Sequence, residues 1–591
     1  MPSKNSHCTS TRRCVYLRVL SIAAVLLLHS ALCHAHGTKH RGDAYIEACM
    51  FDDNKHLDVH DIVIVGGGAA GTFAAWRLQH AKVASKIVLL EATNRIGGRL
   101  YSQQIPGIDY YVADLGGMRY LPDFQPYIKA LVKELKLETK VFEMDSNNEE
   151  KPWFLRGRFF QQKDLVSVGN SAYGLRDDEK LMSPRDIVSS WFETLVPKGE
   201  RSKPSDQMTT IFGDPLINYG LMNGFELVNM SSEAYQYVID TLGFDPSYSN
   251  PNAAAMLSHV LPRSDNLNIL TPVKGMDAIP KQMASEFTVE GGRIEMNTTV
   301  TDIVKCSLLD GTVYVLGAYN YVTGQNTFYV AKKVILALTK SQLKRIRWKD
   351  LETLKQHRLL DAVYGRTASK LILAFDQPWW RHQTLLYLNL TKGRSVSTLP
   401  TRQTFYFTPK TSDATNRSFI MIFNDGYYSN NWSPLSSTDF KQFGGSMSPV
   451  FPVSEVMLEE ALRQIAMNHD TTDAVIGRPY FASFMMWNHA LTPVNVVGYG
   501  PYMPSESWHT WLPGYNFTTV SEAVMQLDPR WDVYVCGEAY AVQSWTEGAI
   551  ETADQVLTRF FKLSSFMNKT EKTDPNSMRS SDIAQSIPFW P

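Results

Sequence analysis

Residues 61–71 read DIVIVGGGAAG, a short apolar run that ends in a cluster of glycines. The apolar run at 61–65 predicts a buried strand, and the alanine-rich stretch at 69–80 predicts a helix. A second apolar run, KIVLL at 86–90, completes a strand–helix–strand order. Two strands joined by a helix need a crossover connection, so they are expected to lie parallel in one sheet.

The glycines Gly66, Gly68 and Gly71 have the spacing of a dinucleotide-binding turn. The first permits a tight turn, the second lets the backbone approach a pyrophosphate, and the third lets the helix pack against the strand. The helix that starts here would direct its free N–H groups and positive dipole end at the phosphates. A glycine cluster by itself is equally compatible with a packing loop. Glu91, at the end of the second strand, can bind the ribose hydroxyls and makes a dinucleotide site the better interpretation.

The chain has 591 residues, of which 44% are hydrophobic and 20% charged, with a formal net charge of −1. This composition is typical of a globular protein with two or more domains. A net charge near zero gives no indication of a nucleic-acid partner. No fixed-period repeat is evident, which argues against a solenoid or propeller.

The first 35 residues have the layout of a signal peptide, with arginines before an apolar run at 19–28 and small residues near Ala35. The alternative, a membrane anchor, is disfavoured because about ten apolar residues span a bilayer poorly. No later segment is long and apolar, so we expect a secreted, extracellular glycoprotein without a stable membrane span. The candidate N-glycosylation sites are Asn229, Asn297, Asn389, Asn416, Asn431, Asn516 and Asn568.

Three cysteines remain after the leader, namely Cys49, Cys306 and Cys536. An odd number cannot all pair within one chain, which excludes a disulfide-framework protein. A bridge between Cys49 and Cys306 is one pairing that the sequence allows. Cys536 lies in the apolar run VYVC and is expected to be a buried, inert thiol. No metal site is expected.

Residues 95–100, RIGGRL, follow Glu91 closely and resemble the second motif of the flavin-containing amine oxidase superfamily. In that motif the second arginine, here Arg99, meets the cofactor phosphates. Residues 532–557, DVYVCGEAYAVQSWTEGAIETADQVL, resemble the superfamily's C-terminal flavin motif. The resemblance places Glu538 near the pyrophosphate and points the following helix at the pyrimidine end of the flavin, where its dipole stabilises negative charge. The implied cofactor is FAD. The cofactor contacts that the resemblance implies are Gly66, Gly68, Ala70, Gly71, Glu91, Ala92, Arg99, Gly116, Gly117, Met118, Arg119, Val300, Gly537, Glu538, Trp545 and Thr546.

Arg119 follows a glycine pair in LGGMRY, where L-amino acid oxidases of this superfamily carry an arginine. A guanidinium fork binds a carboxylate bidentately, so the resemblance makes Arg119 the anchor of the substrate carboxylate. A structural salt bridge is the alternative role. Lys370, in ASKLILAFDQPWW, matches the superfamily lysine that hydrogen-bonds a water beside flavin N5; an ordinary strand-end lysine is the alternative.

Trp545 matches an aromatic wall over the substrate face of the flavin, although a core tryptophan is the simpler interpretation. Phe423, in SFIMIFNDGYY, stands where relatives often have a tyrosine whose hydroxyl helps to hold the carboxylate. A phenylalanine cannot make that hydrogen bond, so the carboxylate of an amino acid would depend on Arg119, and Phe423 favours an amine substrate instead.

Taken together, the motifs are most similar to the secreted molluscan L-amino acid oxidases of the aplysianin, achacin and escapin type, through most of residues 57–560. That resemblance implies an L-amino acid and dioxygen as partners, hydride transfer from Cα to the flavin, and a 2-oxo acid, ammonium and hydrogen peroxide as products. Antimicrobial or cytotoxic defence follows by analogy. A polyamine or monoamine oxidase, and a low-turnover flavoprotein that binds surfaces or glycans, remain alternatives. The sequence indicates no oligomeric state.

The expected fold is α/β, with a doubly wound FAD-binding domain, a mixed-sheet substrate domain and a helical insertion. Each domain is assembled from segments that are separated in the sequence. The FAD-binding domain is assigned to 57–101, 268–345 and 520–562, the substrate domain to 102–165 and 346–519, the helical insertion to 166–267, and a flexible tail to 563–591.

Overall fold

A computed structural model describes residues 58–142, 144, 148–244, 250–260, 268–308, 311–320, 322–348, 355–410, 413, 415–435, 450–451, 453–488 and 505–567. The predicted signal peptide, Cys49, Asn568 and most of the predicted tail lie outside the described residues. Cys306 is disulfide-bonded, but the partner suggested by the sequence, Cys49, is not among the residues described. Cys536 is a free, buried thiol, and burial raises its pKa to about 12.

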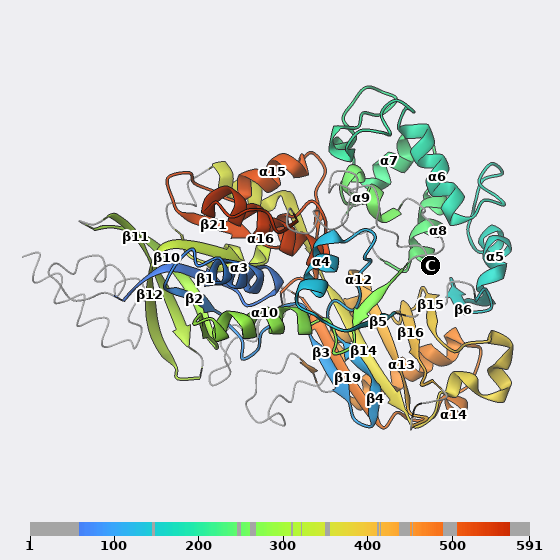
Figure 1. Cartoon of the computed structure of the whole chain (residues 1–591). Helices are drawn as coiled ribbons and strands as arrows, with labels where there is room; N and C mark the ends of the chain where they lie inside the picture. Colours follow the sequence, from blue (N-terminus) through green and yellow to red (C-terminus); the bar gives the residue numbers. More distant parts are fainter. Residues whose placement is uncertain are drawn as a thin grey trace, which may run out of the picture.

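The first sheet contains seven strands in the order β10-β11-β12-β1-β2-β9, with β21 beside β12 (Figure 1). Strand β1 pairs in parallel with β2 and β12, and β12 pairs in parallel with β21. Strands β10, β11 and β12 form an antiparallel meander at one side of this sheet. The strands are β1 Val59–Val65, β2 Ile87–Leu90, β9 Arg293–Glu295, β10 Thr298–Leu308, β11 Gly311–Asn320, β12 Gln325–Ala337 and β21 Val533–Cys536.

Both faces of this sheet are covered, because successive strand residues point to opposite sides. Ile62 and Ile64 of β1 pack in a cluster with helices α3, α4, α10 and α16. Val63 and Val65 pack on the other side in a cluster that includes α15 and residues of the helical region. The helices are α3 Ala69–His80, α4 Pro126–Glu134, α10 Ala278–Val289, α15 Phe517–Val524 and α16 Trp545–Phe561.

The second sheet has eight strands in the order β18-β19-β14-β17-β16-β15-β6-β7. All neighbours are antiparallel except β15 and β6, which are parallel, so the sheet is mixed. Its strands are β6 Pro152–Leu155, β7 Arg158–Gln161, β14 Ala368–Phe375, β15 Gly393–Ser397, β16 Gln403–Phe407, β17 Ser418–Asp425, β18 Val450–Phe451 and β19 Phe481–Trp487. Further helices lie between strands of this sheet along the chain: α11 Lys340–Arg345, α12 Tyr427–Trp432, α13 Glu455–Asn468 and α14 Asp473–Ile476.

Three two-stranded pairs connect these parts. They are β3 Ser102–Ile105 with β4 Ile108–Asp114, β5 Thr139–Val141 with β8 Leu270–Pro272, and β13 Val363–Arg366 with β20 Trp508–Trp511.

A group of helices lies beside the second sheet, at the upper right of Figure 1. Ser183 caps the N-terminus of α6 together with Asp186 in a reciprocal capping box, and Ser231 caps α8. Gly243 ends α8 in a left-handed conformation, φ 76°. The helices are α5 Leu165–Ala172, α6 Pro184–Leu195, α7 Leu221–Leu227, α8 Ser232–Leu242 and α9 Ala253–Val260.

The α/β fold class is confirmed, and the predicted strand, helix and strand at 61–90 form β1, α3 and β2. Strands of the first sheet come from the three segments assigned to the FAD-binding domain, and those of the second from the two substrate segments. Strand β8, assigned to an FAD-binding segment, pairs with β5 of a substrate segment. The exact domain boundaries stay a prediction.

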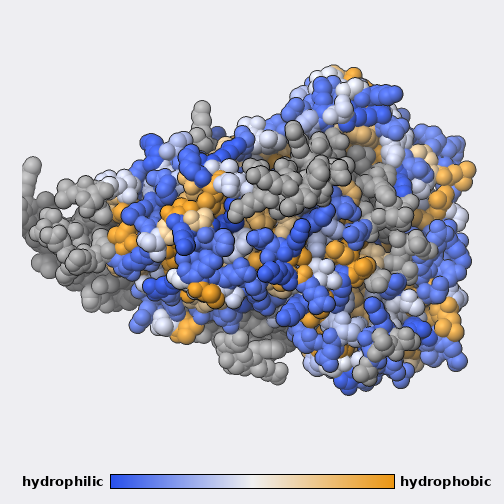
Figure 2. Space-filling model, viewed as in Figure 1, coloured by the Kyte–Doolittle hydropathy of each residue, from blue (hydrophilic) through white to orange (hydrophobic). Residues whose placement is uncertain are grey.

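Hydrophilic residues cover most of the face visible in Figure 2, with hydrophobic residues in scattered patches. Within the part of the chain that the structure describes, no helix is both long and apolar enough to cross a bilayer.

The turn between β1 and α3 has no room for a side chain at its third spaced glycine. A Cβ on Gly71 would lie 1.9 Å from the carbonyl oxygen of Gly66 and 3.2 Å from Cβ of Ala337. We therefore expect Gly71→Ala to push α3 away from the sheet and lower the free energy of unfolding by about 1–3 kcal/mol. Thermal denaturation measures the change. The matched control is Gly199→Ala, since nothing lies within 4 Å of a Cβ there; equal losses in both variants would contradict the packing argument.

Candidate active site

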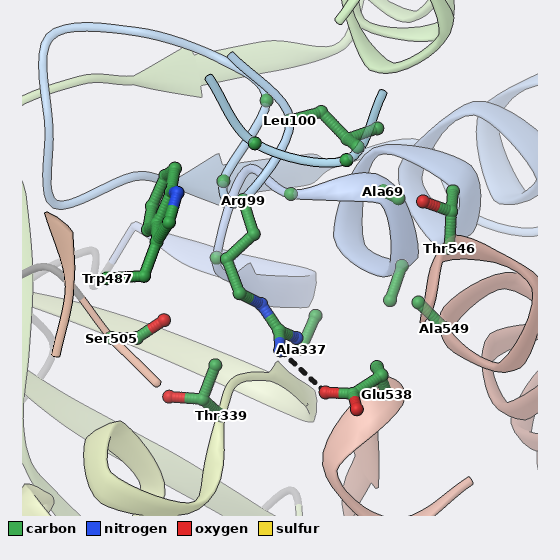
Figure 3. Close-up of a pocket in the computed structure, with 18 of the residues that line it drawn as sticks. Ala69, Arg99, Leu100, Ala337, Thr339, Trp487, Ser505, Glu538, Thr546 and Ala549 are labelled. Atoms are coloured by element: carbon green, nitrogen blue, oxygen red, sulfur yellow. Dashed lines mark hydrogen bonds and ion pairs between the residues drawn. The ribbon is translucent and has the colours of Figure 1, made fainter. Parts of the chain in front are cut away.

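One continuous cavity lies between the carboxyl ends of β1, β2 and β12 and one face of the second sheet. Open α/β sheets bind ligands at the carboxyl ends of their strands, so the cavity is where a dinucleotide is expected. At one end it is lined by the glycine turn, and at the other by residues of β14, β17 and β19. Figure 3 shows residues from both sheets and from α16 pointing into it.

The glycine turn forms the first end of the cavity. Gly66 has φ 107°, and a Cβ there would lie 2.4 Å from the carbonyl oxygen of Ala337. Gly68 precedes α3, and no side chain caps the first turn of that helix. The free N–H groups of the first turn of α3 are thus available to a ligand, as at other phosphate-binding helix N-termini.

Glu91 lies beside this turn and is buried. Its Oε2 accepts a hydrogen bond from the N–H of Gly67 at 2.7 Å, and its Oε1 accepts one from the N–H of Thr93 at 2.8 Å. The carboxylate is therefore held in one position at the cavity wall. This position is compatible with the predicted contact to ribose hydroxyls.

Arg99 and Glu538 form an ion pair across the cavity, drawn as a dashed line in Figure 3. Arg99 Nη1 lies 2.6 Å from Glu538 Oε2. The N–H of His509 also donates to Glu538 Oε1, at 2.9 Å, and the ring Nδ1 of His509 lies 2.8 Å from Oε2. Burial raises the pKa of Glu538, but Arg99 and His509 outweigh it and hold the pKa at about 2. The anionic carboxylate thus fixes Arg99 in the wall.

The glycine pair Gly116–Gly117 and Met118 line the middle of the cavity. A Cβ on Gly116 would lie 1.9 Å from the carbonyl oxygen of Arg99, and the N–H of Gly117 donates to the same oxygen at 3.1 Å. Gly116 is therefore required by the neighbouring backbone, whatever ligand is bound.

The N-terminus of α16 reaches the cavity through Trp545, Thr546 and Ala549. Trp545 has φ 75°, a left-handed conformation that is unusual for a tryptophan. The next residue but one, Glu547, accepts the N–H groups of Tyr127 and Ile128 at 2.9 Å each, which ties α16 to the start of α4. The dipole of α16 thus meets the cavity at a fixed place.

Arg119 lies half-buried in the cavity wall in largely apolar surroundings. Its guanidinium carbon is 5.2 Å from the ring centre of Phe142 and 5.7 Å from that of Phe405, and Nη1 contacts Sδ of Met144. Burial lowers the pKa of Arg119 to about 10. No carboxylate among the described residues pairs with it, so the structural salt bridge considered as an alternative is not found there.

Lys370, on β14, lies buried at the cavity with Asp114 near it. Its Nζ donates to the backbone carbonyl oxygens of Asp114 at 2.7 Å and Gly116 at 2.6 Å. Burial lowers the pKa of Lys370 to about 7, against the attraction of Asp114. Burial also raises the pKa of Asp114 to about 7, although Ser102 and the N–H of Met276 donate to its carboxylate. A proton can thus be gained or lost here near neutral pH.

Aromatic side chains wall the cavity around Lys370. Phe423 stands opposite Lys370 in the pairing of β14 with β17. Trp487 ends β19 and donates from Nε1 to the carbonyl oxygen of Leu115 at 2.9 Å. Phe244, just after α8, meets the ring of Phe423 at 5.8 Å between centres.

Of the predicted site residues, all but Gly71 line this cavity, including Ala70, Ala92, Val300 and Gly537. Gly71 packs α3 on the sheet instead. The structure thus brings these residues together, while the role of each stays a prediction. Sequence reasoning missed Asp114, Phe244, Trp487 and His509. Of these, only Asp114 carried a usable signal, as an acid at the end of a strand just before the glycine pair.

Comparison with known proteins defines the family. Residues 69–446 match the flavin containing amine oxidoreductase family, and the chain belongs to it. Aplysianin-A of Aplysia kurodai is 28% identical over 86% of this chain and 92% of its own, and achacin of Lissachatina fulica is 23% identical over 85% and 93%. An L-amino-acid oxidase of Mus musculus is 27% identical over 61% of this chain and 56% of its own. A structure of a putrescine oxidase variant covers 85% of this chain and 99% of its own, with a TM-score of 0.57 and 15% identity, so it shows the fold.

The cofactor of the protein is FAD, as the sequence predicted. The residues present fit it: an uncapped helix N-terminus at the glycine turn for phosphate, a fixed Glu91 beside it, and a second helix N-terminus, that of α16, at the other end. The cavity joins all three.

Glu538 is expected to retain the cofactor by holding Arg99. Glu538→Gln removes the charge that attracts Arg99, so FAD should bind about tenfold or more weakly, as expected for a lost charged hydrogen bond. Flavin absorbance per protein after dialysis measures this. Glu522→Gln, at an exposed ion pair with Arg559, is the matched control. Full flavin retention in Glu538→Gln would show that Arg99 needs no such support.

Lys370 is expected to make stability depend on pH. Its pKa is about 7 in the folded chain, whereas an unfolded lysine titrates near 10.4, so the unfolded chain binds more protons between these values. The free energy of unfolding should therefore rise with pH above 7, by up to about 1.4 kcal/mol per pH unit from this group. Lys370→Met should lack this contribution. Chemical denaturation at pH 7.5, 8.5 and 9.5 tests it, and parallel profiles for the two proteins would contradict it.

Proposed function

We propose that the protein is a secreted FAD-dependent L-amino acid oxidase that releases hydrogen peroxide. The observation that carries this proposal is Arg119, a guanidinium in the cavity wall with no carboxylate partner among the described residues. A cation in apolar surroundings is stabilised by an anion, and its fork matches a carboxylate. Simple amines lack this group, whereas every α-amino acid has it.

A second basic group supports the same choice. Lys370 lies at the cavity on the sheet that also carries Phe405, the ring beneath Arg119. Burial lowers the pKa of both Arg119 and Lys370, although Asp114 favours the charged form of Lys370. A diamine would add positive charge to this end of the cavity, while an amino acid adds a carboxylate.

In the proposed reaction the chain binds and orients the substrate. Arg119 holds the carboxylate, and Phe423, Trp487 and Trp545 surround the α-carbon and exclude water. Bound FAD would supply the acceptor for a hydride equivalent from the substrate and the route for two electrons to dioxygen, with hydrogen peroxide as the product. Lys370 Nζ, which donates to the carbonyl oxygens of Asp114 and Gly116 at the cavity and whose pKa burial lowers, holds or releases a proton there. The imino acid then adds water to give a 2-oxo acid and ammonium.

The family and its relatives support an oxidase of amines or amino acids. One relative is named an L-amino-acid oxidase, and one structural neighbour a putrescine oxidase. Phe423 provides no hydroxyl for a carboxylate, the one feature that favours an amine substrate. Arg119 is the stronger observation because it places a formal charge in the cavity wall.

Secretion is proposed from the signal-peptide layout of residues 1–35. Glycosylation agrees with it, because Asn229, Asn389, Asn416 and Asn431 are exposed in the structure. Peroxide released outside a cell oxidises thiols and methionines of nearby microbes, so an antimicrobial or cytotoxic role follows from the proposed product.

The proposal is tested by measuring peroxide from a panel of L-amino acids, putrescine, spermine and monoamines. We expect turnover with at least some L-amino acids and none with amines. Peroxide from the amines alone would establish an amine oxidase instead. A yellow protein whose flavin no substrate bleaches under anaerobic conditions would point to a binding protein with little turnover.

Arg119→Met tests the anchor directly. Loss of the charged hydrogen bonds should reduce kcat/KM for L-amino acids by about a hundredfold or more, with FAD still bound. Arg119→Lys keeps the charge without the fork and should recover part of the loss. Steady-state peroxide assays measure both. An unchanged kcat/KM in Arg119→Met would remove Arg119 from this role.

A further inference from the structure

The C-terminal end of α8 is fastened to the second sheet by three buried side chains. Arg402 donates to the carbonyl oxygens of Ile239 at 2.8 Å and Asp240 at 3.0 Å. Arg394 and Gln403 then bind the last carbonyls of this end: Arg394 Nη1 to Leu242 at 3.3 Å, Gln403 Nε2 to Gly243 at 2.7 Å. We call Arg394, Arg402 and Gln403 the α8 clamp.

The carbonyl oxygens at the end of α8 provide hydrogen-bond acceptors for the two buried arginines of the clamp. Arg394 and Arg402 are 2% and 1% exposed, and no described carboxylate forms an ion pair with either. The unpaired carbonyls at a helix C-terminus carry partial negative charge, which favours cations there. Burial, with Arg119 and Arg402 nearby, lowers the pKa of Arg394 to about 9. The hydrogen bonds of the two arginines hold the helix end at a specific position.

The position matters because the residue after the clamp reaches the cavity. Gly243 turns the chain with φ 76°, and Phe244 then lies against Phe423 and lines the cavity. Phe423 is paired with Gln403 of the clamp on one side and with Lys370 on the other. One row of the sheet thus connects the clamp, the aromatic wall and the lysine of the site.

We propose that Phe244 sets the largest substrate side chain that the cavity accepts, and that Arg394 and Arg402 are positioning residues that hold it there. This inference rests on the proposed oxidase function and adds to it a preference for side chains of limited size. The ring closes the cavity on the side of α8, so a bulky side chain collides with it while a small one does not. The clamp prevents the ring from moving aside.

The direct test replaces Phe244 with a smaller or a larger side chain. Phe244→Ala should raise the ratio of kcat/KM for L-tryptophan to that for L-alanine by about tenfold or more, since a hydrophobic pocket discriminates by this much over a few carbons. Phe244→Trp should lower the same ratio. Flavin content should be unchanged in both, because Phe244 lies at the opposite end from the glycine turn.

The clamp is tested by Arg394→Met, with Arg156→Met as its matched control. Arg156 also binds α8, but at the other end of the helix, through Glu233 at 2.6 Å. Arg394→Met should shift the substrate ratio in the same direction as Phe244→Ala, and Arg156→Met should leave it unchanged. Thermal denaturation checks that both variants fold.

A binding measurement separates this inference from the proposed function. Benzoate and 2-naphthoate are titrated into the flavin-loaded wild type and Phe244→Ala, and the visible spectrum of the flavin gives their dissociation constants. If Phe244→Ala binds 2-naphthoate more tightly but benzoate equally well, the inference is supported, whether or not the protein oxidises L-amino acids. Failure to oxidise any L-amino acid would overturn only the proposed function. If L-amino acids are oxidised but neither the kinetic ratio nor the relative binding shifts, Phe244 does not limit the substrate.

Discussion

The close contact of Gly71 with the carbonyl of Gly66 is the constraint on which the rest of the structure depends. It places the start of α3 directly against β1, and the neighbouring Ala337 brings the end of β12 to the same point. Three chain segments thus meet with nothing larger than the methyl group of Ala337 between them. The remaining space is the cavity into which the helix N-terminus opens. Because protein interiors are close-packed, a single added methyl at this point cannot be absorbed locally.

The two halves of the cavity differ in how their charged side chains are paired. In the half near the glycine turn, Arg99 and His509 compensate Glu538, so the charges there fix the wall. In the other half, Arg119 has aromatic neighbours and no described acid, while Lys370 is bound to backbone carbonyls and has Asp114 near it. Buried charge without compensation costs free energy, and sites that bear this cost are commonly functional. The same cavity can therefore hold a cofactor firmly and still attract an anionic group of a substrate.

Much of the fold around the cofactor could be predicted from the sequence because its signals are local. The apolar run before Gly66 and the alanine-rich stretch after it determine β1 and α3 through neighbours in the chain. The motif that contains Arg99 could be found in the same way. Phe244 and His509 could not, because each acts through a partner far away in the sequence: Phe423 for the first, Glu538 for the second.

The sequence by itself determined the strand–helix–strand order, the dinucleotide turn and FAD, since a few residues at fixed spacing are enough to shape a phosphate-binding turn. Only the tertiary structure placed Arg119 where no described carboxylate pairs with it, and Phe244, just after α8, in the lining of the cavity. Both depend on which strands of the second sheet are neighbours. Strand pairing is set by packing over the whole domain, so the neighbour of a strand cannot be predicted from the sequence of that strand alone.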